Sequence, residues 1–220
     1  MDFWIFIDQV WIARWSLASG LILTLLISFL SIVAGSLLGI VFGISLTYGS
    51  LPLRWIARVY TDFIRGTPVL VLVLASYYVL GTVGLQLNPF EAGVLALAVF
   101  CSSHVAEIVR GALQAIPKGQ TEAAKAIGLT FRETFIYVLA PQAIRQILPA
   151  WVNTAAEMVK ACTLLSIIGI GELLLSTQEV IARTFLSLPF YFFAGLLYFL
   201  INFGIESVGR LVEKKVSTQS

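Results

Sequence analysis

The chain has 220 residues, of which 59% are hydrophobic and only 12% are charged, and its formal net charge is +2. Soluble proteins carry about 25% charged residues, because charge is what covers a water-exposed surface. This composition therefore excludes an ordinary soluble globular protein and predicts an integral membrane protein.

The amino-terminal segment, residues 1–18, precedes the first long apolar stretch and is rich in tryptophan. Trp4, Trp11 and Trp15 follow one another at spacings of seven and four, which places them on one face of a helix. Indole rings favour the interface between membrane and water. We expect residues 1–18 to form an external amphipathic helix at that interface, with a scaffold role rather than a binding role.

Five later segments approach the length of about 20 apolar residues that a helix needs to cross the hydrocarbon core. Their lengths predict an all-α integral membrane protein with five transmembrane helices within residues 19–212, since barrel strands would alternate over about 10 residues instead. Residues 213–220 would form a cytoplasmic tail. The expected spans are Ser19–Thr47, Thr67–Leu85, Ala92–Val109, Ile147–Leu174 and Leu188–Gly209.

The positions of the basic residues predict the orientation of these spans, because lysine and arginine are enriched on the cytoplasmic side of a membrane. Only Arg14 and Arg183 fall on the other side, and Lys160 lies within a span. We therefore expect the amino terminus outside and the carboxyl terminus inside. The eleven bases on the inner side are Arg54, Arg58, Arg65, Arg110, Lys118, Lys125, Arg132, Arg145, Arg210, Lys214 and Lys215.

A polar, helix-forming segment, Gly119–Leu129, lies between the third and fourth spans, inside an expected cytoplasmic loop of about residues 117–145. We expect a first helix to open at Gln120 or Thr121, with Glu122 in its first turn and Gly128 just after its end. Thr130–Glu133 has the capping-box pattern of a second helix, which would run until Pro141 disturbs it. The segment thus predicts a helix, a sharp corner and another helix.

The same segment carries a family resemblance. Glu122-Ala123-Ala124 is followed after three residues by Gly128, and after nine more residues by Val138–Pro141. This pattern resembles the EAA loop of ABC importer permeases, although the family pattern usually ends Ile-x-Leu-Pro. In that family the loop docks on a cytoplasmic ATPase; the alternative is an ordinary amphipathic loop between spans. The docking residues that the resemblance implies are Gln120, Thr121, Glu122, Ala123, Ala124, Lys125, Ala126, Gly128 and Leu129.

Three further motifs are similar to those of polar amino-acid permeases, and the resemblance covers about residues 20–211. They are Phe63–Pro68, Ala106–Gly111 followed by Gly119-Gln120, and Pro141–Arg145 followed by Leu148-Pro149 and Asn153. The resemblance implies the type I ABC importer permease fold and a multi-pass subunit of the bacterial inner membrane, surrounded by lipid. Its implied partners are two ABC ATPases, a second permease (identical or paralogous), an extracytoplasmic substrate-binding protein and an amino-acid substrate, with no nucleic acid.

The sequence departs from this family in the fourth span. The family commonly has Lys-Asp/Glu-Thr-Ser-Leu where Lys160–Leu164 reads Lys-Ala-Cys-Thr-Leu, and His104 stands where a tyrosine is usual. Ala161 and Cys162 therefore leave open which amino acid is carried and whether this subunit holds the ligand site.

Charged groups within the spans need a partner or water, because an isolated charge near the bilayer centre costs several kcal/mol. Glu157 and Lys160 lie three residues apart on one helical face, so they either line a substrate pathway or form a closed structural ion pair. Glu107 and Arg110 have the same spacing, which favours a pair that positions the docking loop over a ligand contact. His104 is expected to be a packed, hydrogen-bonding residue rather than a pH sensor. The candidate pathway residues are Glu157, Lys160, Ala161, Thr163, His104 and Glu107.

Glycines mark two further features. Gly35, Gly39 and Gly43 repeat every four residues, a pattern typical of tight helix packing. Gly169 and Gly171 break the fourth span, either to expose backbone groups to a ligand or to allow close contact with another helix.

These observations favour a transport subunit over an enzyme. The sequence has no Gly-x-x-x-x-Gly-Lys-Ser/Thr motif, so ATP and Mg²⁺ would be bound by a partner ATPase, and no cofactor is expected on this chain. The one histidine and two cysteines lack metal-ligand spacing, so no metal site is expected. The alternative function is a self-sufficient carrier or channel for small polar solutes, which would require an internal repeat.

Overall fold

The computed structural model describes residues 3–217, with side chains for 4–215, and places helices throughout, with no strand in that range. This confirms the all-α prediction. Residues 1–2 of the expected interfacial segment and 218–220 of the expected tail lie outside the described range.

The helices follow one another in an order that matches the predicted spans and loops only in part. The carboxyl-terminal helix continues through the expected tail as far as Ser217. The elements are α1 (Phe3–Tyr48), α2 (Leu51–Gly66), α3 (Val69–Leu74), a π-helical turn (Ala75–Val79), α4 (Leu80–Thr82), α5 (Pro89–Ala115), α6 (Lys118–Ala126), α7 (Phe131–Glu133), a second π-helical turn (Thr134–Leu139), α8 (Ala140–Ala161), a 3₁₀ helix (Cys162–Ile168), α9 (Leu173–Thr184) and α10 (Ser187–Ser217).

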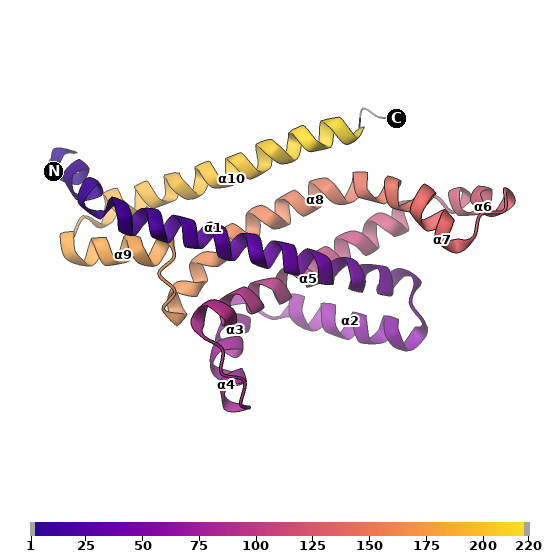
Figure 1. Ribbon diagram of the computed structural model, residues 1–220, viewed down its shortest axis with the longest axis horizontal. Helices are drawn as coiled ribbons and strands as arrows, with labels where there is room; N and C mark the ends of the chain where they lie inside the picture. The colour runs from indigo at the N-terminus through magenta and orange to yellow at the C-terminus, as the bar shows by residue number, and fades with distance from the viewer. Residues whose placement is uncertain (1–2, 218–220) are drawn as a thin grey trace.

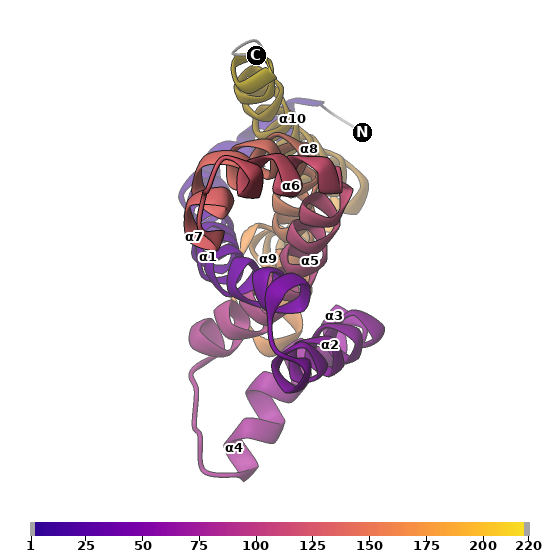
Figure 2. The ribbon, with the colours of Figure 1, turned by 90° about the vertical axis from the view of Figure 1, so that its right-hand side faces the viewer.

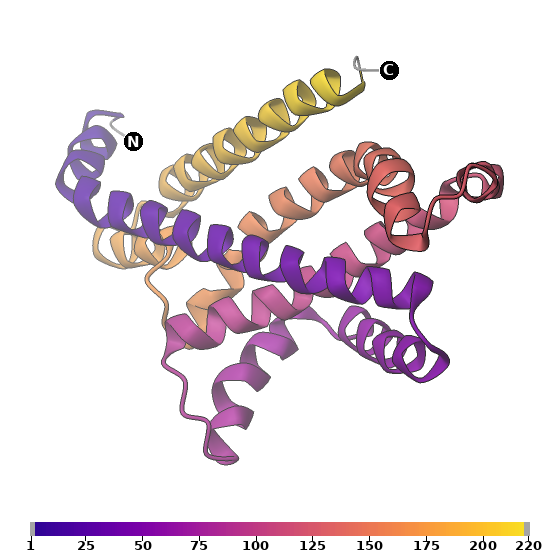
Figure 3. The same ribbon diagram turned by 45° about the vertical axis from the view of Figure 1, so that its right-hand side comes forward.

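The long helices α1, α5, α8 and α10 run lengthwise through the molecule, and short helices stand at its two ends (Figure 1). Helices α6 and α7 lie at one end, and α9 lies at the other beside the amino terminus (Figures 1 and 3). Viewed from the α6 end, α2, α3 and α4 hang to one side of the group formed by α1, α5 and α8 (Figure 2). Helix α6, which is polar, and helix α9 therefore lie at opposite ends of the molecule (Figure 1).

Helices α1 and α5 pack closely along a row of glycines, which confirms the predicted packing motif. A Cβ atom built on Gly39 would lie 2.6 Å from the Cβ of Val105, and Gly35 and Gly43 face α5 in the same way one turn before and after. Since real Cβ atoms do not come this close, only glycine allows the two backbones to approach at this distance.

The number of spans is three by helix length and composition, or up to five if each bent pair of helices counts as one span. Helices α2 and α3–α4 meet at 106°, so the expected second span Thr67–Leu85 forms only the short second limb of such a pair. Helix α1 is one uninterrupted helix from Phe3 to Tyr48, so residues 3–18 of the expected interfacial segment continue directly into the first span.

The fourth predicted span, Ile147–Leu174, does not continue to its expected end. The helical path breaks after Ile168, and α9 leaves at an angle of 53°. Gly169 has φ +81°, a left-handed conformation that favours glycine. A Cβ on Gly169 or Gly171 would meet no atom within 4 Å, so these glycines turn the chain and do not mediate close contact between helices.

Candidate functional site

Helix α6 begins earlier than the sequence indicated. It starts at Lys118, directly after Pro117, so the expected start at Gln120 or Thr121 is wrong and Glu122 lies beyond the first turn. The physical reason is Pro117, whose fixed φ of −56° suits a residue at a helix start and whose missing N–H leaves no donor unpaired there.

The corner after α6 is built as predicted. Gly128 has φ +86°, its N–H donates to the Lys125 carbonyl at 3.0 Å, and the Leu129 N–H donates to the Ala124 carbonyl at 3.1 Å. These two bonds are those of a Schellman motif, which satisfies the last carbonyls of a helix. The corner is therefore fixed by its own backbone.

The second helix also starts as predicted. The Thr130 Oγ1 accepts from the Glu133 N–H, and the Glu133 carboxylate accepts from the Thr130 N–H at 2.8 Å, which completes a capping box. Its predicted end is wrong, because the helical path passes through a π-helical turn into α8 and continues through Pro141. Pro141 lies in the first turn of α8, where a missing N–H is tolerated.

Most of the predicted docking residues are exposed. Ala124 is buried against the bundle and Thr121 and Leu129 are half-buried, while the others on α6 face outward. Gln142 of α8 donates to the Gln120 side chain at 3.4 Å, which ties α6 to the bundle. We define the α6 surface as the exposed predicted docking residues of this helix together with two exposed apolar side chains next to it. It consists of Gln120, Glu122, Ala123, Lys125, Ala126, Ile127 and Phe131.

Two members of the α6 surface were missed by the sequence analysis. Ile127, which directly follows α6, is 77% exposed, and Phe131, the first residue of α7, is 60% exposed and packs edge-on against Tyr48. The sequence could have indicated both residues, since they are large and apolar in an otherwise polar segment. Exposed apolar side chains with a polar surround are typical of a protein contact surface.

The candidate pathway residues on α8 form an exposed polar stripe. Asn153, Glu157 and Lys160 are exposed at spacings of four and three, as one face of a helix requires. No ion pair joins Glu157 to Lys160 among the residues that the structure describes, so the closed-pair alternative is wrong. Both side chains are exposed in this structure, and an ion pair between solvent-exposed groups gains little.

The side chains of Ala161 and Thr163, the other two candidates on this segment, are less exposed. Ala161 is half-buried against the apolar cluster around Cys162 and Leu165. The Thr163 hydroxyl donates to the Lys160 carbonyl at 2.7 Å. Thr154, which we expected to extend the polar face, is buried and donates to the Ala150 carbonyl instead.

Glu107 forms the predicted pair with Arg110 and gains two partners that the sequence did not indicate. Its carboxylate lies 2.6 Å from the Arg110 Nη2, 3.0 Å from the Arg58 Nη1 and 3.7 Å from the Arg65 Nη1, and its side chain is only 14% exposed. Arg110 also donates to Gln114 at 2.7 Å. The cluster joins α5 to α2, so its first structural consequence is to hold these two helices together.

His104 adopts the packed arrangement expected of it. Its Nδ1 lies 3.0 Å from the Phe100 carbonyl oxygen, and its ring is 4.4 Å from the Phe100 ring. No hydrogen bond or ion pair in the described chain joins the α5 candidates His104 and Glu107 to the α8 candidates. The six predicted pathway residues are therefore split between α5 and the segment formed by α8 and the 3₁₀ helix that follows it.

A buried carboxylate at the α8–α9 break was also missed. Glu172 is fully buried, accepts from the N–H groups of Leu174 and Leu175, and accepts from the Tyr198 hydroxyl at 2.7 Å. It thereby caps α9 and fastens it to α10. Its position directly after Gly169–Gly171 was the only local signal. Within the described range, no three His, Cys, Asp or Glu side chains gather as metal ligands would.

The sequence of this chain is similar to those of known transport proteins. Residues 31–218 match the family described as binding-protein-dependent transport system inner membrane component. The arginine transport system permease protein of Bacillus subtilis (strain 168) is 34% identical over 200 residues, covering 90% of this chain and 91% of the relative. The glutamine transport system permease protein of Escherichia coli (strain K12) is 34% identical over 211 residues, covering 95% and 96%.

Solved structures show the same fold. The crystal structure of an amino acid ABC transporter with histidines aligns with a TM-score of 0.89 at 33% identity, over 98% of this chain and 99% of that chain. An inward-facing MetNI methionine ABC transporter aligns with a TM-score of 0.80 at 22% identity, over 92% and 96%. The second likeness shows the fold alone.

Proposed function

This chain belongs to the family of binding-protein-dependent transport system inner membrane components, and we propose that its α6 surface docks on the ATPase that drives import of polar amino acids. The chain is a membrane permease subunit of an ABC importer and not an enzyme, since ATP hydrolysis in this family occurs on a separate ATPase subunit. In our proposal the ATPase binds the α6 surface, and its motion enters the bundle through α6 and α8.

The position and stiffness of α6 support this role. The helix stands at one end of the molecule, exposes a mixed polar and apolar face, and is held by the Gln142–Gln120 contact and the Schellman motif. The capping box then leads directly into α8 without a break (Figure 3). A displacement of α6 would pass into α8 because no flexible linker lies between them.

Mechanical coupling follows from this continuity. ATP and Mg²⁺, bound by the ATPases, would close the ATPase pair, and the docked α6 would move with it. Since α8 carries Glu157 and Lys160, the same movement would reorient the exposed polar stripe between the two sides of the membrane. The bundle would thus alternate between inward-open and outward-open states.

The membrane placement that we propose puts α6 in the cytoplasm and the amino terminus outside, in the bacterial inner membrane with five spans. Eleven of the 14 basic residues then lie on the inner side, as the preference of lysine and arginine for that side requires. Trp4, Trp11 and Trp15, which are 75%, 67% and 74% exposed, would lie at the outer interface. A second permease, two ATPases and an external binding protein would complete the importer.

The open Glu157–Lys160 stripe suits a zwitterionic substrate. We propose that Lys160 faces the substrate carboxylate and Glu157 an amino or basic group, because each is exposed and without an ion-pair partner among the described residues. Relatives that are named for arginine and glutamine transport fit this substrate class.

Copurification of an ATPase tests the docking proposal. The tagged chain is expressed in its own bacterium, extracted in detergent, and its bound proteins are identified by mass spectrometry. An ABC ATPase should accompany the unaltered chain and be lost from a Glu122→Lys variant, whose charge is reversed on the α6 surface. Glu179→Lys is the matched control, since Glu179 is exposed on α9 at the opposite end.

Two results would contradict the proposal. One is an ATPase that stays bound both to Glu122→Lys and to a chain lacking residues 121–129. The other is solute accumulation by vesicles that contain this chain alone and no nucleotide, which would favour a self-sufficient carrier.

A further inference from the structure

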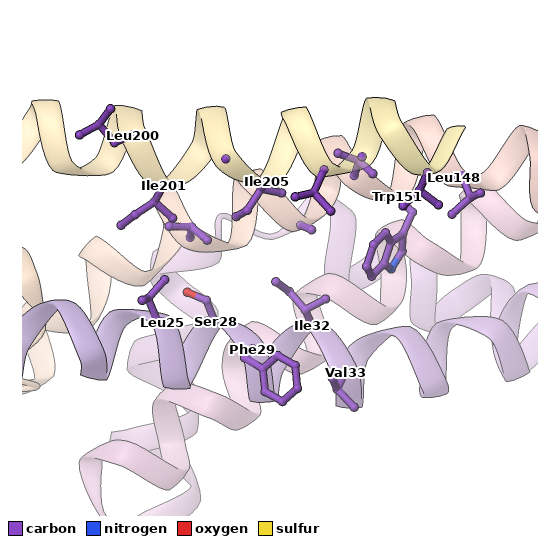
Figure 4. Close-up of a pocket in the computed structure, with 17 residues that line it drawn as sticks. Leu25, Ser28, Phe29, Ile32, Val33, Leu148, Trp151, Leu200, Ile201 and Ile205 are labelled. Atoms are coloured by element: carbon purple, nitrogen blue, oxygen red, sulfur yellow. The ribbon is translucent and has the colours of Figure 1, made fainter. Parts of the chain in front are cut away.

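A long apolar groove lies between α1, α8 and α10, away from every candidate residue described above. Its volume is about 700 Å³, and its walls are almost entirely aliphatic and aromatic. Figure 4 shows Leu25 and Ile32 of α1 facing Ile201 and Ile205 of α10, with Trp151 of α8 near one end. Helix α10 packs mainly on α8 and α9 and contacts α1 through Phe6 and Phe190 near its amino-terminal end, whereas the groove lies farther along, at residues 200–212. A groove of this size matches sites that hold small ligands, about 300–1,000 Å³.

A smaller polar pocket of about 210 Å³ adjoins the groove and shares Val152 and Gly209 with it. Its charged residues are Glu206, Arg210 and Glu213, all on α10, and Asn153 of the exposed polar stripe on α8 also lines it. Arg210 lies 3.6 Å from Glu206, and both side chains are about half exposed. The apolar groove thus ends beside a pocket that contains the guanidinium of Arg210 and the carboxylates of Glu206 and Glu213.

The groove faces away from Glu157, the proposed substrate contact on α8, while the adjoining pocket reaches Asn153. On α8 its wall includes Leu148, Val152, Ala155 and Val159, spaced by four, three and four residues. Glu157 precedes Val159 by two residues and therefore points about 200° away around the helix. If the polar stripe faces the pathway between two permeases, the groove faces the lipid side of the bundle.

We propose that the groove binds one zwitterionic aminophospholipid, with its acyl chains along α1, α8 and α10 and its headgroup in the adjoining pocket. Arg210 would contact the phosphate, and Glu206 and Glu213 would contact the ammonium. Two carboxylates to one guanidinium favour a headgroup that carries an amine and disfavour one that carries only negative charge. The walls, in which Ser28 supplies the one hydroxyl among aliphatic and aromatic side chains, suit hydrocarbon better than water.

Two glycines on α10 make this proposal testable with a matched pair of variants. Gly204 lines the groove, and a Cβ built on it would meet no atom within 4 Å. The Cβ of a Gly204→Leu side chain would therefore fit without displacing protein atoms, and its remaining atoms would take up groove volume. Gly195 lies on the same helix, is equally free of neighbours within 4 Å, and does not line the groove, so Gly195→Leu is the control.

The experiment uses the full chain in nanodiscs that hold equal amounts of phosphatidylethanolamine and phosphatidylglycerol, and native mass spectrometry counts the lipids that remain bound after release. The unaltered chain and Gly195→Leu should retain phosphatidylethanolamine, and Gly204→Leu should retain about tenfold less. A Glu206→Gln, Glu213→Gln double variant should keep a bound lipid but lose the preference for phosphatidylethanolamine.

Several outcomes would overturn the proposal. Equal retention of phosphatidylethanolamine by Gly204→Leu and Gly195→Leu would exclude the groove as the site. An unchanged preference in the glutamate double variant would exclude the headgroup contacts, and this result does not require Gly204→Leu to fold. A shift in the monomer–dimer ratio of Gly204→Leu with no change in bound lipid would assign the groove to a second copy of the chain. None of these measurements involves the ATPase, so their failure is distinct from failure of the docking proposal.

Discussion

Glu107 and Glu157 lie on two long helices and are each followed three residues later by a base, yet only Glu107 forms an ion pair with that base. Glu107 on α5 bonds Arg110 through both carboxylate oxygens and also contacts Arg58 and Arg65. On α8, Glu157 and Lys160 are both exposed, and no ion pair joins them. The same spacing thus gives a closed cluster in one helix and an open pair in the other.

The difference comes from what covers each helix and from the base itself. Helix α2 packs against α5 and brings two arginines to Glu107, whereas the Glu157 face of α8 is uncovered. Arginine presents a planar fork that can bond both oxygens of a carboxylate, while lysine is a flexible point charge. We infer that the covered glutamate serves the fold and that the uncovered one is available to a ligand.

The largest expected effect is on stability, from removal of the covered glutamate. Glu107→Ala leaves three guanidiniums close together without their shared carboxylate and should lower the free energy of unfolding by about 3 kcal/mol. Denaturant unfolding of the purified chain in detergent measures this. Glu157→Ala is the control and should change stability by no more than about 0.5 kcal/mol. Similar losses in the two variants would remove the distinction between the two glutamates.

A second prediction concerns transport and addresses the open pair. Glu157→Gln should reduce the initial rate of labelled arginine or glutamine import about tenfold, the equivalent of one lost charge-assisted contact of ~1.4 kcal/mol. The measurement uses the complete importer in vesicles with saturating binding protein and ATP. Glu179→Gln on α9 is the control for loss of one exposed carboxylate. Import that is unchanged in rate and selectivity would exclude a substrate role for Glu157.

The smallest effect should come from exchanging the two bases. Arg110→Lys keeps the charge but loses the two-point contact with Glu107, so the free energy of unfolding should fall by about 1 kcal/mol. Lys160→Arg, the reciprocal change, should alter it by no more than about 0.5 kcal/mol because its site is exposed. Equal effects in the same unfolding assay would mean that the geometry of the base is unimportant.

The α6–α7 corner could be predicted from sequence because its signals are local. Gly128 supplies the left-handed residue, and Thr130 and Glu133 cap the next helix within four residues of one another. The two errors in this region concern proline. Pro117 allowed an earlier start to α6, and Pro141 was accommodated in the first turn of α8 instead of ending the helix. In both cases the proline falls where its missing N–H needs no partner.

The candidate pathway was predicted less well, because it depends on which helices face one another. The partnership of Arg58 with Glu107 joins residues 49 positions apart, and nothing in the local pattern selects it. Burial of Thr154 and half-burial of Ala161 likewise depend on neighbouring helices. Helical periodicity correctly placed Asn153, Glu157 and Lys160 on one face but could not say whether that face was covered.

By itself, the sequence determined that this chain is a helical membrane protein, that a stiff polar corner follows the third expected span, and which motifs resemble those of importer permeases. These features follow from composition and from hydrogen bonds between near neighbours in the chain. Tertiary structure alone decided that Glu107 is shared by three arginines, that Glu172 fastens α9 to α10, and that a groove remains between α1, α8 and α10. Such features require contacts between distant segments, whose formation depends on how whole helix faces fit together.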